Sequence, residues 1–215
     1  MTYEELATDR HQALRMENNR GIKAAALALA EERGLGNFTV EELASRAQVS
    51  RRTFFNHFGS IQEATRAGIR DILFDASESV MVELATRLAS VENPSLNQLF
   101  ELGSDALLNV DFTTTVRQSC RVLGDHPREN PVQSAWLGEV LDAALDDFDT
   151  LLGSRAPEVS PVSRRLMVRV LLTTVEVCAE HWAQTSIQLP PAEGLEAWRK
   201  LHSQAISQLR AGYTA

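Results

Sequence analysis

Two short segments, residues 39–46 and 50–57, flank a three-residue turn, and this arrangement constrains the fold more than any other feature of the chain. Thr39 followed by Glu42 is the pattern of a capping box, which begins a helix. A turn this short sets two helices at a steep angle, so apolar side chains must fill the inside corner. The sequence supplies them at Val40, Leu43, Ala44, Ala47, Val49, Phe54 and Phe58. We therefore expect a helix-turn-helix over residues 39–58.

The second of these helices has a set of side chains, polar apart from one aromatic ring, on the side that the corner does not use. It consists of Arg51, Arg52, Thr53, Phe55, Asn56 and His57. Guanidinium, hydroxyl and amide groups read base edges and bind phosphates in a major groove. Ser50 as N-cap leaves the N–H groups of the helix start available to an anion. Paired arginines also occur on solvated faces, but capping, corner packing and the polar set agree here, and together they favour DNA binding.

The rest of the chain predicts further helices and hardly any strand, because sustained apolar–polar alternation and Asn-Gly or Asp-Gly hairpin turns are missing. Ser60 with Glu63 repeats the capping pattern, and Ser160-Pro161 and Asn130-Pro131 place a capping residue before a proline. We expect an all-α fold of about nine to ten helices. The expected ranges are 15–34, 39–46, 50–57, 60–74, 75–91, 95–109, 113–124, 131–152, 161–186 and 192–210.

Charge is distributed unevenly along the chain, whose formal net charge is −8. Residues 1–70 carry ten Lys and Arg against nine Asp and Glu, whereas the remaining residues carry eleven against twenty. A nearly neutral head on an acidic body is compatible with DNA binding where arginines share one face, and it predicts weak non-specific binding.

Residues 20–66 resemble the N-terminal domain of the TetR family, through Ile22–Ala26, Glu32–Gly34, Phe38–Ala44 and Val49–Phe58. The resemblance implies a DNA-binding head, residues 1–60 with 1–14 as a flexible arm, and a helical effector-binding and dimerisation domain, residues 61–215. Carried over by position, it nominates as DNA contacts Thr39, Ser50, Arg51, Arg52, Thr53, Phe55, Asn56 and His57. Two positions depart from the family pattern: Gln48 stands where glycine is usual in the turn, and Ile61 stands where lysine usually contacts a phosphate.

The resemblance also implies a ligand-responsive regulator, a repressor that binds a palindromic operator as a homodimer through its last two long helices. Abundant Leu, Val and Ala suit an apolar pocket for a small lipophilic effector, although they suit any helical core equally. The candidate pocket residues are Phe112, Cys120, Trp136, Cys178, His181 and Trp182, and the candidate dimer residues are Leu171, Val175, Leu195, Trp198, Leu201 and Ile206. The alternatives are a regulator without a small-molecule ligand and a structural helical bundle.

Other functional classes find little support. The chain carries no G-x-S-x-G, P-loop, H-E-x-x-H or glycine-rich dinucleotide motif, so we expect no enzyme and no cofactor. Cys178 and His181 share a helix face, but two ligands without a second pair do not predict a metal site. The two cysteines are distant in sequence, and the start of the chain has no apolar run of the kind found in signal peptides. No later segment is long and apolar enough to span a membrane. We therefore expect a cytoplasmic protein that does not span a membrane.

Overall fold

The computed structural model describes residues 3–123 and 131–212, and every regular element in these ranges is an α-helix. None of the helices described there is long and apolar enough to cross a membrane. The helices are α1 (Tyr3–Arg33), α2 (Val40–Arg46), α3 (Arg51–His57), α4 (Ile61–Leu88), α5 (Leu96–Asn109), α6 (Thr113–Leu123), α7 (Pro131–Arg155), α8 (Pro161–Ser186) and α9 (Pro191–Ala211). The predicted all-α class is confirmed.

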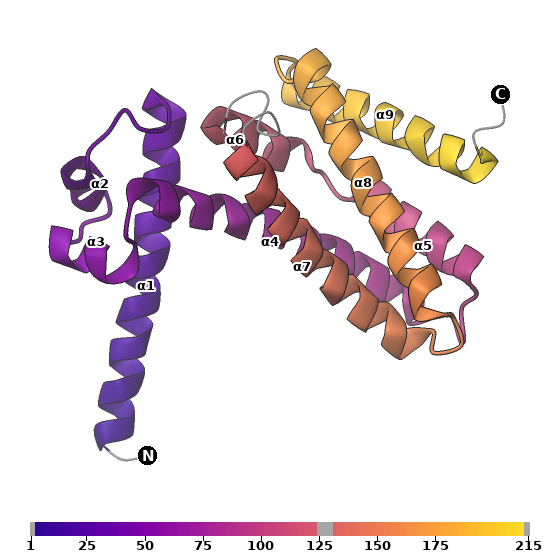
Figure 1. Cartoon of the computed structure of the whole chain (residues 1–215), viewed down its shortest axis with the longest axis horizontal. Coiled ribbons are helices and arrows are strands. Elements are labelled where there is room, and N and C mark those ends of the chain that lie inside the picture. The colour runs from indigo at the N-terminus through magenta and orange to yellow at the C-terminus, as the bar shows by residue number, and fades with distance from the viewer. Residues whose placement is uncertain (1–2, 124–130, 213–215) are drawn as a thin grey trace. The chain divides into compact units, whose positions relative to one another are not determined.

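The chain divides into two compact units. The first comprises Met1–Ile72 with Arg121–Leu123. Figure 1 shows α2 and α3 packed on one side of α1, and both contact it. The apolar residues of α1 recur at helical spacing and lie buried against the short helices and the start of α4. The buried apolar residues of α1 are Ile22, Ala25, Ala26, Leu29 and Ala30. They pack in one core with Leu43, Ala44, Phe54, Phe58, Ala64 and Ile69.

Side-chain caps begin several helices, as the sequence predicts. Thr39 forms both halves of a capping box with Glu42 at the start of α2. Ser160 accepts a hydrogen bond from the Ser163 backbone N–H at the start of α8. At α4 only half of the expected box forms with Ser60, because the Glu63 carboxylate accepts from the backbone N–H of Gly59 instead, at 2.7 Å. The predicted cap at Asn130 lies outside the described residues.

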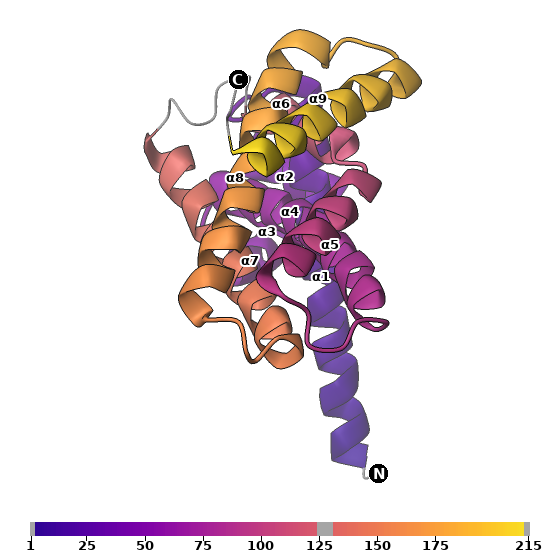
Figure 2. The ribbon, with the colours of Figure 1, turned by 90° about the vertical axis from the view of Figure 1, so that its right-hand side faces the viewer.

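The second unit comprises Leu73–Cys120 and Gly124–Ala215. Within it α8 packs against α7, α9 and α5, and Figure 2 shows α9 crossing beside α8. Its core combines aliphatic side chains with two wholly buried tryptophans, Trp182 and Trp198. His202 is also wholly buried, 5.7 Å from the Trp198 ring, and neither imidazole nitrogen has a hydrogen-bond partner among the described residues.

Two helices run further than the sequence predicts. Residues 3–14, expected as an arm, belong to α1, which begins at Tyr3 instead of near residue 15. The expected helices 60–74 and 75–91 are one continuous helix, α4, and this merger explains why residues 3–123 and 131–212 form nine helices where ten ranges are expected. No glycine or proline occurs between Gly68 and Pro94, so nothing in the chain interrupts the hydrogen-bond ladder there.

Candidate nucleic-acid interface

The turn between α2 and α3 is tight and uses an unusual backbone conformation. Gln48 has φ = 55°, in the left-handed region that favours glycine. The backbone N–H of Val49 donates to the Ala44 carbonyl at 2.9 Å, and that of Gln48 donates to the Ser45 carbonyl at 3.1 Å. Gln48 therefore adopts the conformation for which glycine is better suited, and the turn keeps its geometry despite the Cβ.

The inside corner is filled as expected. Leu43, Ala44, Phe54 and Phe58 are buried, Phe54 completely. The other three predicted corner residues, Val40, Ala47 and Val49, are partly buried. Because these apolar side chains occupy one side of α3, they fix which of its residues face outward.

The outward face of α3 exposes most of the predicted DNA-contacting side chains. Arg51, Arg52, Phe55 and Asn56 are exposed, and half of the Phe55 surface is accessible. An exposed phenylalanine of this size on a short helix offers an apolar contact for a thymine methyl group or a sugar. Thr53 and His57 are partly buried at the edges of this face.

Hydroxyl groups at the helix starts are occupied in the free protein. Ser50 Oγ accepts from the Thr53 backbone N–H at 3.0 Å and lies 2.8 Å from the Thr53 hydroxyl. The Thr39 hydroxyl donates to the Glu42 carboxylate at 3.2 Å and accepts from the Glu42 N–H at 3.3 Å. Thr39 must give up the bond to the carboxylate before its hydroxyl can donate to a phosphate.

The two arginines of α3 differ in their surroundings. Arg51 forms an ion pair with Glu41 of α2, whereas the described residues provide no ion-pair partner for Arg52. Both side chains are exposed. Arg52 can therefore bind an anion directly, whereas Arg51 must first break its ion pair with Glu41.

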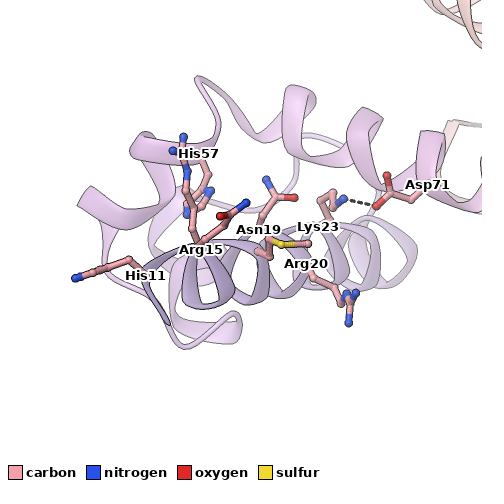
Figure 3. A pocket seen from close by; sticks show the side chains of 9 residues that line it. His11, Arg15, Asn19, Arg20, Lys23, His57 and Asp71 are labelled. Carbon is pink, nitrogen blue, oxygen red and sulfur yellow. Dashed lines mark hydrogen bonds and ion pairs between the residues drawn. The ribbon is translucent and has the colours of Figure 1, made fainter. Parts of the chain in front are cut away.

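His57, at the end of α3, lies beside α1. Partial burial, and secondarily the positive charge of Arg15, lower the pKa of this imidazole from its ordinary value. Figure 3 shows His57 and Arg15 on the same side of α1, lining a groove together with Asn19. The sequence prediction of an arm over residues 1–14 leaves His11 outside any helix and so does not include this groove, although the i, i+4 spacing of residues 11, 15, 19 and 23 indicates a common helix face.

The candidate effector residues are dispersed in the second unit. Phe112 packs 5.6 Å from Trp198, and Trp182 donates from Nε1 to the Gly194 carbonyl at 2.8 Å. The Arg117 guanidinium lies 4.9 Å from the Trp182 ring centre, so this tryptophan joins α6, α8 and α9. The other four candidates differ in burial: Cys178 is buried, Cys120 and Trp136 are partly buried, and His181 is exposed.

The second unit has a small apolar cavity of about 20 Å³, room for a water molecule at most. None of the six candidate effector residues lines it. Its walls come from Val80, Leu84, Leu99, Gly103, Leu107, Phe148, Leu152, Met167, Val168, Leu171 and Leu172. Among the residues that the structure describes, no cluster of three His, Cys, Asp or Glu side chains could hold a metal ion.

Comparison with known proteins supports the reading of the first unit. Residues 22–63 match the model of the bacterial regulatory proteins of the tetR family, which spans α2, α3 and parts of α1 and α4. No curated protein matches the chain in sequence.

Solved structures share the fold over most of the chain. The fatty acid degradation regulator FadR from Bacillus halodurans is 14% identical, with a TM-score of 0.57 over 90% of this chain and 96% of that one. A TetR-family regulator from Mesorhizobium loti is 14% identical, with a TM-score of 0.56 over 90% of this chain and 96% of that one. A transcriptional regulator from Streptomyces coelicolor A3(2) is 17% identical, with a TM-score of 0.53 over 87% of this chain and 99% of that one. Residues 22–63 thus match the DNA-binding segment of the tetR family, and the chain as a whole shares the fold of these solved transcription regulators.

Proposed function

We propose that this protein is a repressor that binds a palindromic operator as a homodimer and is released by a small lipophilic effector. The exposed polar face of α3 carries this proposal. It places Arg52, Phe55 and Asn56 outward on a helix whose opposite side is locked by buried Phe54. A helix held so firmly can enter a major groove without reorganising.

The proposed DNA-binding domain covers residues 1–60, and its proposed contacts fall into two groups. Arg52 and Asn56 read base edges, since guanidinium and amide groups make bidentate bonds to guanine and adenine. Phosphates are bound by Arg51 after its release from Glu41, by the start of α3 at Ser50 and by the Thr39 hydroxyl. Thr53, Phe55 and His57 complete the contact surface.

A dimer is needed because one small head contacts too little DNA for specific binding, and two-fold symmetry then produces the palindromic site. Three of the expected interface residues, Leu171, Trp198 and Ile206, are buried in the core of their own chain and are not available to a partner. We therefore assign the interface to the exposed face of α8. Its large apolar side chains are Val162, Leu166 and Val177, at spacings that place them along one side of the helix.

The effector proposal concerns residues 61–215. The small cavity between α4, α5, α7 and α8 has only apolar side chains and one glycine in its walls, so a ligand that widens it must itself be apolar. The original candidates, Phe112, Cys120, Trp136, Cys178, His181 and Trp182, remain a second set to test. Because α4 contributes residues to both units, a ligand that tilts this helix alters the placement of the recognition helices.

The experiment is a mobility shift with double-stranded DNA from upstream of the protein's own gene, with unrelated DNA as competitor. The wild-type chain is expected to bind specifically, and the double variant Arg51→Ala, Arg52→Ala is expected to lose that binding. The double variant Arg199→Ala, Lys200→Ala on α9 removes the same two positive charges at exposed sites and should bind normally. If the double variant binds like the wild type, α3 is not the recognition helix.

A further inference from the structure

The groove beside α1 is lined by two arginine side chains, Arg15 and Arg20, that have no carboxylate partner among the described residues. It has a volume of about 770 Å³. Figure 3 shows that α1 contributes most of its lining, with His57 from α3 and Asp71 from α4. On α1 the lining follows two adjacent rows at i, i+4 spacing, which are His11, Arg15, Asn19 and Lys23 in one row and Gln12, Met16 and Arg20 in the other.

Among the described side chains that line this groove, one is a carboxylate, and it already has an ion-pair partner. Asp71 forms an ion pair with Lys23. Arg15 and Arg20 have no carboxylate partner among the described residues, and Glu17 of α1 lies on neither row. Two guanidinium groups without a carboxylate partner among the described residues therefore share a groove on a protein whose net charge is −8. An anion in the groove would relieve their mutual repulsion.

Residues 11–17 of α1 also lack the packing that normally stabilises a helix. Residues 11–17 are all exposed, including Leu14 and Met16, which are more than half accessible. Helical turns that bury no apolar face are marginal in water, so a partner along this surface would stabilise them. The lining suits a chain of phosphates and sugars, because arginine forks bind phosphate oxygens in pairs and Met16 offers an apolar contact.

We propose that the groove lined by His11, Arg15, Asn19, Arg20 and His57 binds the sugar–phosphate backbone of the operator, beside the major groove that α3 enters. The proposal rests on the proposed function, since it uses DNA already positioned by α3. His57 links the two surfaces, because it ends the recognition helix and also lines the groove. Contacts of this kind strengthen binding to all sequences alike and carry no base preference.

The test measures the salt dependence of DNA binding by the full chain. The probe is an operator selected by the wild-type protein from a random double-stranded DNA pool, compared with a scrambled duplex of equal length. Arg15→Gln with Arg20→Gln is expected to reduce the slope of log K against log salt by about two, because each phosphate contact contributes about 0.9. The ratio of operator to scrambled affinity should stay unchanged.

Two variants control for trivial effects. Arg199→Gln with Lys200→Gln, which removes two charges from exposed sites of α9, should keep the wild-type slope. Arg15→Lys with Arg20→Lys keeps both charges and should recover most of the slope. Circular dichroism and melting temperature verify that each variant remains folded. An unchanged slope in the Gln double variant, with specific binding intact, overturns the groove proposal alone.

The remaining outcomes are also decisive. If the wild-type chain selects no operator from the pool, the proposed function fails, which is distinct from failure of the groove. Inorganic phosphate provides the other arm: if it raises the melting temperature of the wild type but not of the Gln double variant, while both have the same DNA salt slope, the groove binds free phosphate and the DNA proposal is wrong.

Discussion

Arg51 of α3 and Glu41 of α2 form an exposed ion pair, with 2.5 Å between Arg51 Nη1 and Glu41 Oε1. The pair lies on the surface that we propose faces DNA, so binding replaces a carboxylate partner with a phosphate. Exposed pairs of this kind contribute about 0.2–1 kcal/mol, which is small enough to exchange readily. The free protein thereby keeps one arginine of its recognition helix masked.

We expect Glu41→Gln to tighten DNA binding by up to about fivefold, because Arg51 no longer has to leave a carboxylate and one negative charge is removed from the interface. The measurement is a titration of operator DNA at fixed salt. Glu196→Gln, an exposed glutamate of α9, is the control and should leave affinity unchanged. Weaker binding by the Glu41 variant, at an unchanged melting temperature, would show that the ion pair positions Arg51 for DNA.

The left-handed residue in the turn predicts a stabilising substitution. Gln48→Gly should raise the free energy of unfolding by about 1 kcal/mol, because relief of the φ = 55° strain exceeds the added entropy of glycine in the unfolded chain. Gln48→Val, whose branched Cβ tolerates this conformation poorly, should lower it. Denaturant unfolding followed by circular dichroism measures both. A glycine variant less stable than the wild type would mean that the Gln48 side chain contributes contacts that outweigh the strain.

The proposed dimer face predicts a change of oligomeric state. Leu166→Glu on α8 places a charge in the centre of the apolar side chains Val162, Leu166 and Val177, and burying it unpaired is costly. We expect a monomer in sedimentation velocity at micromolar concentration, with weakened operator binding. Val82→Glu, an equally exposed apolar site on α4, should remain dimeric. A dimeric Leu166 variant places the interface elsewhere.

His202 predicts how stability depends on pH. Burial lowers the pKa of its imidazole to about 4, from an ordinary value near 6.5. Between these pH values the unfolded chain binds a proton that the folded chain does not, so acid favours unfolding. This residue should therefore remove about 3 kcal/mol of stability as the pH falls from about 6.5 to about 4.

The variant His202→Leu should flatten that part of the pH profile and leave stability at pH 7 similar or higher, since an unpartnered buried imidazole is replaced by an apolar side chain of similar size. Urea unfolding at pH 7 and pH 5 measures the difference. His181→Gln, at an exposed position of α8, serves as control and should keep the wild-type profile. An equal loss of stability in wild type and His202→Leu would assign the acid sensitivity to other groups.

Contacts between residues close in sequence are sufficient to predict the helix-turn-helix of residues 39–58. The capping box at Thr39 and the corner residues Leu43 and Phe54 depend on neighbours close in sequence, so spacing alone predicts them. The ion pair of Arg51 with Glu41 depends on how two helices cross, and the spacing within either helix contains no trace of it.

The second unit was less predictable because its contacts join helices far apart in sequence. Trp182, a candidate pocket residue, hydrogen-bonds Gly194 and stacks on Arg117, and its place in the sequence reveals neither contact. An aromatic residue on an amphipathic helix has the same sequence pattern in either role. Trp198 was likewise expected at a subunit interface, although it lies in the core of its own chain.

Because α1 is one continuous helix, the direction of each side chain depends on its position along that helix. Its buried stripe from Ile22 to Ala30 and its exposed rows from His11 to Arg20 share one helical phase, about 100° per residue. Deleting Asn18 would leave the stripe in place while rotating Arg15 and His11 by that angle about the axis, away from His57. The removal of one uncharged residue can thus redirect a cationic surface without altering net charge, composition of the core or the helix-turn-helix.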